Sequence, residues 1–285
     1  MNTTTPNKNR PIGDIISQTN NLTPDQVEAV LQHQKTNGSR FGEAAVALGF
    51  INGDDVVWAL AQQYEYPYSH AKTSSLSEEL IVARHPFSPE AEMFRELRSQ
   101  LLISHFPENQ PHRPFAVLSP NRGDGKSFFA ANLAIAFAQL GRNTVLIDAD
   151  LRNPRLSSMF GLTKLDGGLA DTLAGRAAPN VYIPAQDLPN LYLLPAGNPP
   201  PNPLELIERT GFSQLLAELS KKFDYVIVDT PASEVGADNG AIAARCGAGM
   251  VIARKDQSRE ADMARLLTVL KIAKVDVAGV LLNEC

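Results

Sequence analysis

The chain has 285 residues, of which 44% are hydrophobic and 20% charged, a composition typical of a globular protein rather than a disordered or fibrous one. Its 26 Lys and Arg against 31 Asp and Glu give a net charge of −5, which argues against a surface devoted to nucleic acid or anionic lipid. Only two cysteines, Cys246 and Cys285, are present, so a disulfide framework is excluded. The polar N-terminus and the lack of a run of about 18 apolar residues predict a cytoplasmic chain without direct membrane insertion.

Residues 8–68 are predicted to form a small helical domain, because this part of the sequence repeats. Asp25 aligns with Asp54 and Gln34 with Gln63 at the same shift of 29 residues. Each unit begins with a short helix and continues, after a turn, into a second helix with a capping signal at Thr23 or Asn52. Two such helical hairpins can bury their apolar faces against each other.

Residues 69–88 are rich in Ser and lack sustained periodicity, so they are predicted to be a linker. A helix is expected over residues 89–105. The domain assigned to residues 89–285 then alternates short apolar runs with helical segments. The runs are FAVLS, TVLID, LYLLP, YVIVD, GMVIA and VAGVLLN, with helices expected at 127–140, 211–221, 237–245 and 259–273. This alternation predicts an α/β fold, a doubly wound and mostly parallel sheet with helices on both faces.

A phosphate-binding loop is predicted directly after the first strand, where the sequence reads Ser-Pro-Asn-Arg-Gly-Asp-Gly-Lys-Ser and a helix follows. Glycines let backbone N–H groups turn toward an anion, Lys126 can reach the β and γ phosphates, and the Ser127 hydroxyl can bind Mg²⁺. Pro120 replaces the first glycine of the general motif, and the alternative is a glycine-rich turn with an incidental lysine. The candidate ligands in this loop are Gly123, Asp124, Gly125, Lys126, Ser127 and Phe128.

Polar residues follow two further strands. Asp148, Asp150 and Arg152 come after TVLI, and Asp229 ends YVIVD. Carboxyl ends of parallel strands are where open α/β sheets bind ligands. We expect Asp148 to be the general base for an acceptor hydroxyl and Asp150 and Asp229 to hold metal or water, with Asp148 as a further candidate metal ligand. The alternative is that these carboxylates only cap turns.

At these residues the sequence resembles the bacterial tyrosine kinases of capsule and exopolysaccharide synthesis, within the ParA and MinD-like P-loop ATPases. Like those kinases, it lacks the extra lysine of MinD-like ATPases, which would fall at Asn121. Residues 197–206 (GNPPPNPLEL) and 279–283 (GVLLN) extend the resemblance. The resemblance implies ATP and Mg²⁺ as cofactors, a tyrosine of a protein as substrate, and a transmembrane polysaccharide co-polymerase as activating partner in chain-length control.

The resemblance also implies two further roles. Glu92, Arg95 and Arg98 match a helix that joins subunits of the family into a homo-oligomeric ring, although their spacing of three equally suits pairs within one helix. Asn283 matches the residue that contacts adenine, although it is also an ordinary strand-end residue.

The family commonly carries a C-terminal tyrosine cluster, whereas this sequence ends in Asn283-Glu284-Cys285, so autophosphorylation of that kind is not expected. The tyrosines Tyr64, Tyr66 and Tyr68 could be a relocated cluster, or could pack as aromatic residues of the helical module. The competing function is a regulatory ATPase or scaffold without tyrosine transfer.

The repeat of residues 8–68 resembles the N-terminal domain of type II secretion ATPases, some of which bind cyclic di-GMP. The residues that match the binding motif are Arg40, Gly42, Gly49 and Gln63, and an arginine can stack on guanine while glycines admit close backbone approach. The first unit has lost half of this set, so binding should be weakened, and the alternative is a protein-docking module.

Overall fold

The protein separates into two compact units, Met1–Ser74 and Ser75–Cys285. This computed structural model describes residues 10–63, 75–107, 112–162, 167–176, 182–185 and 188–284. The tyrosines at 64, 66 and 68 lie outside the described residues. In the part of the chain that the structure describes, no helix is both long and apolar enough to cross a bilayer.

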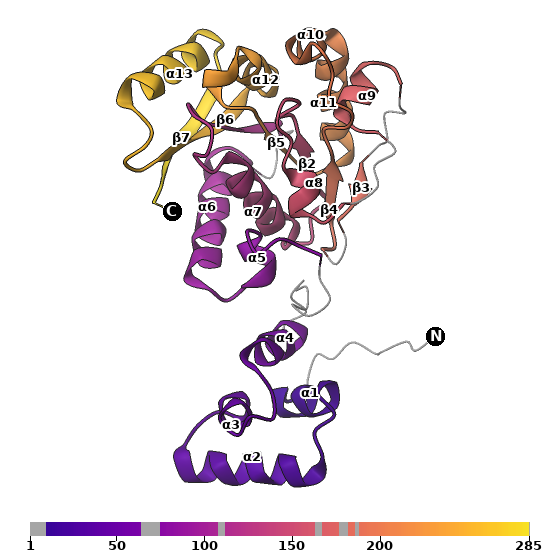
Figure 1. Cartoon of the computed structure of the whole chain (residues 1–285), viewed down its shortest axis with the longest axis vertical. Coiled ribbons are helices and arrows are strands. Elements are labelled where there is room, and N and C mark those ends of the chain that lie inside the picture. The colour runs from indigo at the N-terminus through magenta and orange to yellow at the C-terminus, as the bar shows by residue number, and fades with distance from the viewer. Residues whose placement is uncertain are drawn as a thin grey trace. The chain divides into compact units, whose positions relative to one another are not determined.

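The first unit contains the two predicted helical hairpins (Figure 1). The Thr23 side chain accepts a hydrogen bond from the Gln26 backbone N–H, and the Gln26 side chain accepts one from the Thr23 N–H. Asn52 and Asp55 exchange the same pair of bonds at the equivalent place in the second unit of the repeat. Both helices therefore begin at the capping signals seen in the sequence. The helices are α1 (Ile12–Thr19), α2 (Pro24–Asn37), α3 (Phe41–Ala47) and α4 (Gly53–Gln63).

The second unit is built on a seven-stranded sheet with the strand order β3-β4-β2-β5-β1-β6-β7. All neighbouring strands are parallel except the short β3, which is antiparallel to β4. The predicted mostly parallel α/β fold is thus confirmed. The strands are β1 (Phe115–Leu118), β2 (Thr144–Asp148), β3 (Ile183–Pro184), β4 (Leu191–Leu194), β5 (Tyr225–Asp229), β6 (Ala248–Arg254) and β7 (Asp276–Asn283).

Helices cover both faces of this sheet because alternate strand residues point to opposite sides. In β5, Ile227 belongs to a core shared with α6 and α7, whereas Val226 and Val228 belong to a core shared with α11, α12 and α13. The helices of this unit are α5 (Ile81–Arg84), α6 (Pro89–Ser104), α7 (Lys126–Ala138), α8 (Leu156–Met159), α9 (Leu169–Leu173), α10 (Pro203–Glu208), α11 (Thr210–Lys222), the 3₁₀ turn η1 (Ser233–Val235), α12 (Asp238–Cys246) and α13 (Glu260–Ile272).

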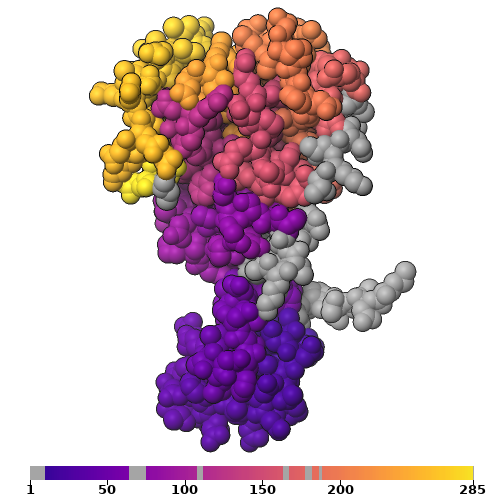
Figure 2. Space-filling view, in the orientation of Figure 1, coloured from indigo at the N-terminus to yellow at the C-terminus, as the bar shows by residue number. Residues whose placement is uncertain are grey.

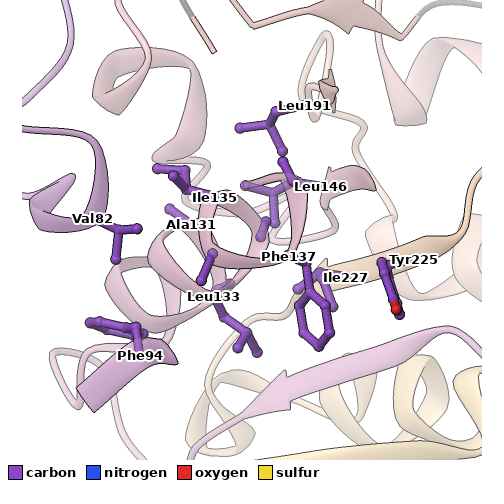
Figure 3. Packing of buried hydrophobic residues seen from close by; sticks show 14 of the residues in the cluster. Val82, Phe94, Ala131, Leu133, Ile135, Phe137, Leu146, Leu191, Tyr225 and Ile227 are labelled. Atoms are coloured by element: carbon purple, nitrogen blue, oxygen red, sulfur yellow. The ribbon is translucent and has the colours of Figure 1, made fainter. Parts of the chain in front are cut away.

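Helix α7 is the central element of the first of these cores. Every residue from Ala130 to Ala138 is buried, and all of them except Asn132 are apolar, so this part of the helix has no polar face. Figure 3 shows Leu133 and Phe137 of α7 among residues from α6, β2 and β5. The predicted phosphate-binding loop leads directly into α7. Its C-terminal end is therefore held in a fixed position by the most buried helix of the unit.

The linker predicted for residues 69–88 is wrong for residues 75–88, which pack as part of the second unit. Leu76, Leu80, Val82 and Ala83 are buried in the core that contains α7. In the space-filling view, the atoms coloured for residues 75–107 are continuous with the body of the second unit (Figure 2). The Asn132 side chain holds the segment, since its Oδ1 accepts from the Val82 N–H at 2.9 Å and its Nδ2 donates to the Glu79 carbonyl at 2.8 Å.

Replacing Asn132 with alanine is expected to lower the free energy of unfolding by about 2 kcal/mol, because the buried Val82 N–H loses its acceptor. The Ser99→Ala variant is the control, since the exposed Ser99 hydroxyl only donates within α6. Urea denaturation measures both variants. A loss below about 0.5 kcal/mol for Asn132→Ala would mean that water replaces the amide and that residues 75–88 are held by apolar burial alone.

Candidate active site

The P-loop, residues 119–127, includes the turn between β1 and α7 and the first two residues of α7, and its backbone has the shape of an anion cradle. Gly123 and Gly125 have φ values of 80° and 103°, which favour glycine. A Cβ atom at Gly125 would also lie 2.6 Å from Nδ2 of Asn283. The backbone N–H groups of the first turn of α7 lack partners within the helix, so they are available to a phosphate.

The Asp124 side chain holds the loop in this shape. One carboxylate oxygen accepts from the Asn121 N–H at 2.7 Å, and the other accepts from the Ser258 hydroxyl at 2.8 Å. Asp124 is almost fully buried. The carboxylate of Asp124 therefore positions the loop, and its predicted contribution to nucleotide binding, which is left to the backbone of this residue, stays a prediction.

Residues of three other elements, η1, β6 and β7, form hydrogen bonds to the loop. The Arg122 N–H donates to the Glu234 carboxylate of η1 at 2.7 Å, and the Arg254 guanidinium donates to the Gly123 carbonyl at 3.3 Å. Asn283, at the end of β7, donates to the Asp124 carbonyl at 3.0 Å. Asn283 is thus beside the phosphate loop, where the adenine-contacting role predicted for it stays a prediction.

Asp148 and Asp229 lie side by side at the ends of adjacent strands. They are paired in register across β2 and β5, and both are completely buried. Asp148 Oδ2 accepts from the Leu156 N–H at 3.1 Å. By hydrogen-bond geometry, Asp148 Oδ1 and both oxygens of Asp229 have no partner among the described residues. Three carboxylate oxygens are therefore buried without a well-formed hydrogen bond, although the Ser127 hydroxyl lies near Asp229. This arrangement is costly unless a cation or a proton compensates it.

Burial raises the pKa of Asp229 to about 7, although the Ser127 hydroxyl and the Lys126 charge lower it. Burial, and then the neighbouring Asp229, raise the pKa of Asp148 well above its ordinary value. Burial lowers the pKa of Lys126, against the attraction of Asp229 and Asp150. Two acids and one base with perturbed pKa values at a strand end are the pattern of a functional site.

Asp150 and Arg152 occupy the turn after β2. Asp150 Oδ1 accepts from the N–H groups of Arg152 and Asn153 at 3.2 and 2.9 Å. The Arg152 Nε donates to the Asp238 carboxylate of α12 at 2.7 Å, and this hydrogen bond raises the pKa of Arg152. Asp238 is buried, whereas 35% of the Arg152 side chain is exposed. Arg152 is therefore held by α12, at the rim of the site rather than in the cradle.

The residues fit a nucleotide with Mg²⁺. Asp229 lies beside Ser127 and Lys126, and Asp148 lies beside Asp229. Carboxylates, a P-loop hydroxyl and phosphate oxygens are the ligands that Mg²⁺ prefers. Within the described ranges, no three His, Cys, Asp or Glu side chains form a metal-binding group by themselves. Phosphate oxygens would supply the remaining ligands.

The family model described as ParA, NUBPL iron-transfer P-loop NTPase, matches residues 111–284, more than half of the chain. The tyrosine-protein kinase CpsD of Streptococcus pneumoniae serotype 4 is 31% identical over 169 residues, which are 59% of this chain and 74% of that protein. The EpsB protein of Ralstonia solanacearum is 34% identical over 204 residues, 72% of this chain but only 27% of EpsB. The chain thus spans about a quarter of that longer relative.

Solved structures point the same way. The kinase domain of the Escherichia coli tyrosine kinase ETK has a TM-score of 0.67 and 27% identity, covering 72% of this chain and 79% of that domain. The chain belongs to the bacterial tyrosine-kinase family of ParA-type P-loop NTPases. MinD of Pyrococcus horikoshii in complex with Mg-ADP is a more remote neighbour, with a TM-score of 0.53 and 26% identity over 60% of this chain and 70% of that one.

The side chain of Phe128, another predicted nucleotide-binding residue, packs away from the cradle. Its ring packs against Phe94 of α6 and against Phe129, with ring centroids 5.8 and 5.5 Å apart. Successive helical residues point about 100° apart, so Ser127 can face the cradle while the next side chain enters the core. Only the backbone N–H of Phe128 is left for the predicted nucleotide contact.

The α6 residues matched to the ring-forming helix of the kinase family make contacts within this chain. Arg95 pairs with Glu92 at 2.6 Å and also donates to the Pro86 carbonyl. Arg98 donates to the Ala136 carbonyl near the end of α7 at 2.7 Å. The pair within the helix, which was the alternative, is present, and ring formation stays a prediction.

The residues matched to a cyclic di-GMP motif have structural roles in the first unit. A Cβ at Gly42 would lie 2.8 Å from the Val56 side chain, so Gly42 allows close helix packing. Gly49 has a φ of 71° in the turn after α3. The Gln63 amide donates to the Arg10 carbonyl at 3.3 Å, and Arg40 precedes α3 as its N-cap residue. Ligand binding by this unit stays a prediction.

Sequence reasoning missed the residues that hold the site from a distance. Asp238, Glu234 and Ser258 each contact the P-loop or the turn after β2, yet each lies outside a recognisable motif. A lone carboxylate at a helix start is typical of capping, so one sequence offers no signal for Asp238.

Proposed function

We propose that the chain is an ATP- and Mg²⁺-dependent protein-tyrosine kinase. The observation that carries the proposal is the pair of buried carboxylates, Asp148 and Asp229, which are in register and have three unpartnered oxygens, with Asp229 acting on the P-loop lysine. The similarity to tyrosine kinases along most of the second unit supports the choice of tyrosine as acceptor.

In this proposal, the backbone of residues 123–127 and Lys126 bind the β and γ phosphates, and Ser127 and Asp229 hold the metal. Bound Mg²⁺ would neutralise phosphate charge and orient the γ phosphate. The protein contributes position and fixed charge, since Asp124 holds the loop and burial keeps water away from the strand ends.

The burial of Asp148 favours a division of roles different from the one that the sequence suggested. Asp148 is completely buried, so an acceptor hydroxyl arriving from solvent does not reach it, whereas Asp150 is partly exposed. Asp150 Oδ2 has no donor among the described residues, and its charge acts on Lys126. We therefore propose that Asp150 accepts the proton of the tyrosine hydroxyl while the tyrosine oxygen attacks the γ phosphorus and ADP leaves. Asp148 would instead help Asp229 to hold the metal.

The biological role follows from the family resemblance. We propose that the kinase acts in exopolysaccharide chain-length control, at the cytoplasmic side of the inner membrane, with a transmembrane co-polymerase as activator. Ring formation through α6 and binding of cyclic di-GMP by the first unit belong to the same proposal.

The test is incubation of the full chain with γ-labelled ATP, Mg²⁺ and a glutamate–tyrosine copolymer, with and without the cytoplasmic segment of the co-polymerase. Phosphotyrosine and free phosphate are measured separately. Phosphotyrosine that depends on Asp150, as tested with Asp150→Asn, is the expected result. Free phosphate without phosphotyrosine would replace this proposal with a regulatory ATPase.

A further inference from the structure

The proline segment, residues 195–203, leaves the sheet next to the candidate active site. It follows β4, and Leu194 of β4 is paired with Ile147 of β2. The next residues of the two strands are Pro195 and Asp148, so the backbone of the segment begins about 5 Å, one strand spacing, from that of Asp148, whereas Asp229 lies one strand further away. Nothing in the proposed transfer of phosphate uses this segment.

Helix α9 fixes the base of the proline segment. The Leu169 and Ala170 N–H groups donate to the carbonyls of Pro195 and Ala196 at 2.8 and 2.9 Å. A Cβ atom on Gly168 would collide with the backbone of Gly197. The contact is therefore backbone on backbone, and it leaves the segment little freedom to move.

A buried carboxylate fixes the middle of the proline segment. Asp171 accepts from the Asn198 backbone N–H and from the Asn198 side-chain amide, both at 3.0 Å. Asp171 is 4% exposed. Burial raises the pKa of Asp171, but the bonds from Asn198 and the charge of Arg176 outweigh it and hold this pKa below its ordinary value. A buried, ionised carboxylate thus fixes the conformation of the proline segment through its hydrogen bonds to Asn198.

The rest of the proline segment faces solvent. Asn198, Pro199, Pro201 and Asn202 are exposed, and Pro203 is buried at the start of α10. Consecutive prolines have fixed φ angles and no N–H donors, so they present flat rings and free carbonyls on an extended backbone. Such a surface binds an extended peptide with little loss of conformational entropy.

The contacts of the P-loop indicate the direction in which a bound peptide can run. On the β6 and β7 side, Arg254, Ser258 and Asn283 already contact the P-loop. Among the described residues, no hydrogen bond to the P-loop comes from β4, so a peptide whose tyrosine reaches Asp150 can continue over the end of β4. We propose that residues 198–202 dock the extended segment flanking the acceptor tyrosine of a protein substrate. This inference rests on the proposed kinase function.

The test compares two acceptors of different length, the glutamate–tyrosine copolymer and N-acetyltyrosinamide, using the full chain with ATP and Mg²⁺. The small acceptor is too short to reach the proline segment. For the double variant Pro199→Ser/Pro201→Ser, and for Asp171→Asn, the ratio of kcat/KM for the copolymer to that for the small acceptor is expected to fall about fivefold, mainly through the KM of the copolymer.

The matched control is Asp224→Asn. The Asp224 carboxylate accepts a hydrogen bond from the Asn143 N–H at 2.9 Å and so also anchors a loop, but at the amino ends of the strands, opposite to the candidate active site. In this control, the ratio of kcat/KM for the copolymer to kcat/KM for N-acetyltyrosinamide should equal that of the wild type. An unchanged ratio in the proline-segment variants, or an equal fall in the control, overturns the inference alone. Absence of phosphotyrosine on both acceptors in the wild type overturns the kinase function and this inference with it.

Discussion

The Lys126→Met variant is expected to lose tyrosine phosphorylation and ATP turnover by about 10³-fold or more, because the only P-loop lysine neutralises charge on the transferred phosphate. Its fold should persist. Lys126 is buried and its pKa is lowered by that burial, so a methionine of similar length removes the cost of desolvating a cation. Phosphotyrosine, free phosphate and thermal unfolding are measured on the same preparation.

The control for this variant is Lys221→Met. Lys221 is exposed in the last turn of α11, close to the amino end of β5 and therefore away from the candidate active site. It should retain wild-type turnover. If Lys126→Met kept more than about a tenth of the wild-type rate, the loop would bind its ligand through backbone groups alone, and the proposed role of the lysine would be wrong.

The Asp229→Asn variant is expected to move activity and stability in opposite directions. Turnover with Mg²⁺ should fall about 10²-fold or more, because a neutral amide is a poor ligand for this cation. The nucleotide-free protein should become more stable by about 1 kcal/mol or more, because the charge of Asp229 is buried against Asp148. Functional sites commonly conserve groups that destabilise the fold.

The gain in stability should also depend on pH. The pKa of Asp229 is raised from 3.8 to about 7 by burial, so between these values the folded state keeps a proton that the unfolded state has lost. This contribution to wild-type stability is complete below about pH 4 and is lost as the pH rises through about 7. Asp229→Asn cannot titrate, so its advantage should be larger at pH 8 than at pH 5.

Urea denaturation of both proteins without nucleotide or metal, at a series of pH values, measures this difference. The control is Asp262→Asn on α13, where an ion pair to Arg265 at 3.7 Å lies near the surface. Parallel stability curves for wild type and Asp229→Asn across pH 4 to 8 would contradict the assignment of a raised pKa to Asp229.

The P-loop and the three strand-end carboxylates could be predicted because each lies in a continuous motif. An apolar run followed by Asp148, or by Asp229, specifies both the strand and the place where the side chain leaves it. Helix bounds followed from the same kind of local signal, as at Thr23 and Asn52. Local sequence therefore fixes a strand, its end and the residue placed there.

The errors arose where distant residues decide the outcome. Residues 75–88 are polar in composition, and their order depends on the Asn132 amide, which belongs to another helix. Phe128 follows the motif in sequence, but the turn of the helix sends its ring into the core. The hold of Asp238 on Arg152 joins residues 86 positions apart. No local pattern reports a contact of that separation.

The hydrogen bonds of Asp124 to Asn121 and Ser258 also set the thermodynamic character of the cradle. Since these bonds lie within the protein, the backbone entropy of the loop is lost when the chain folds and not when a phosphate arrives. A phosphate therefore binds to a preorganised loop, and its binding does not have to order the backbone. Selectivity among phosphates depends on how closely their shape and charge match a preformed surface.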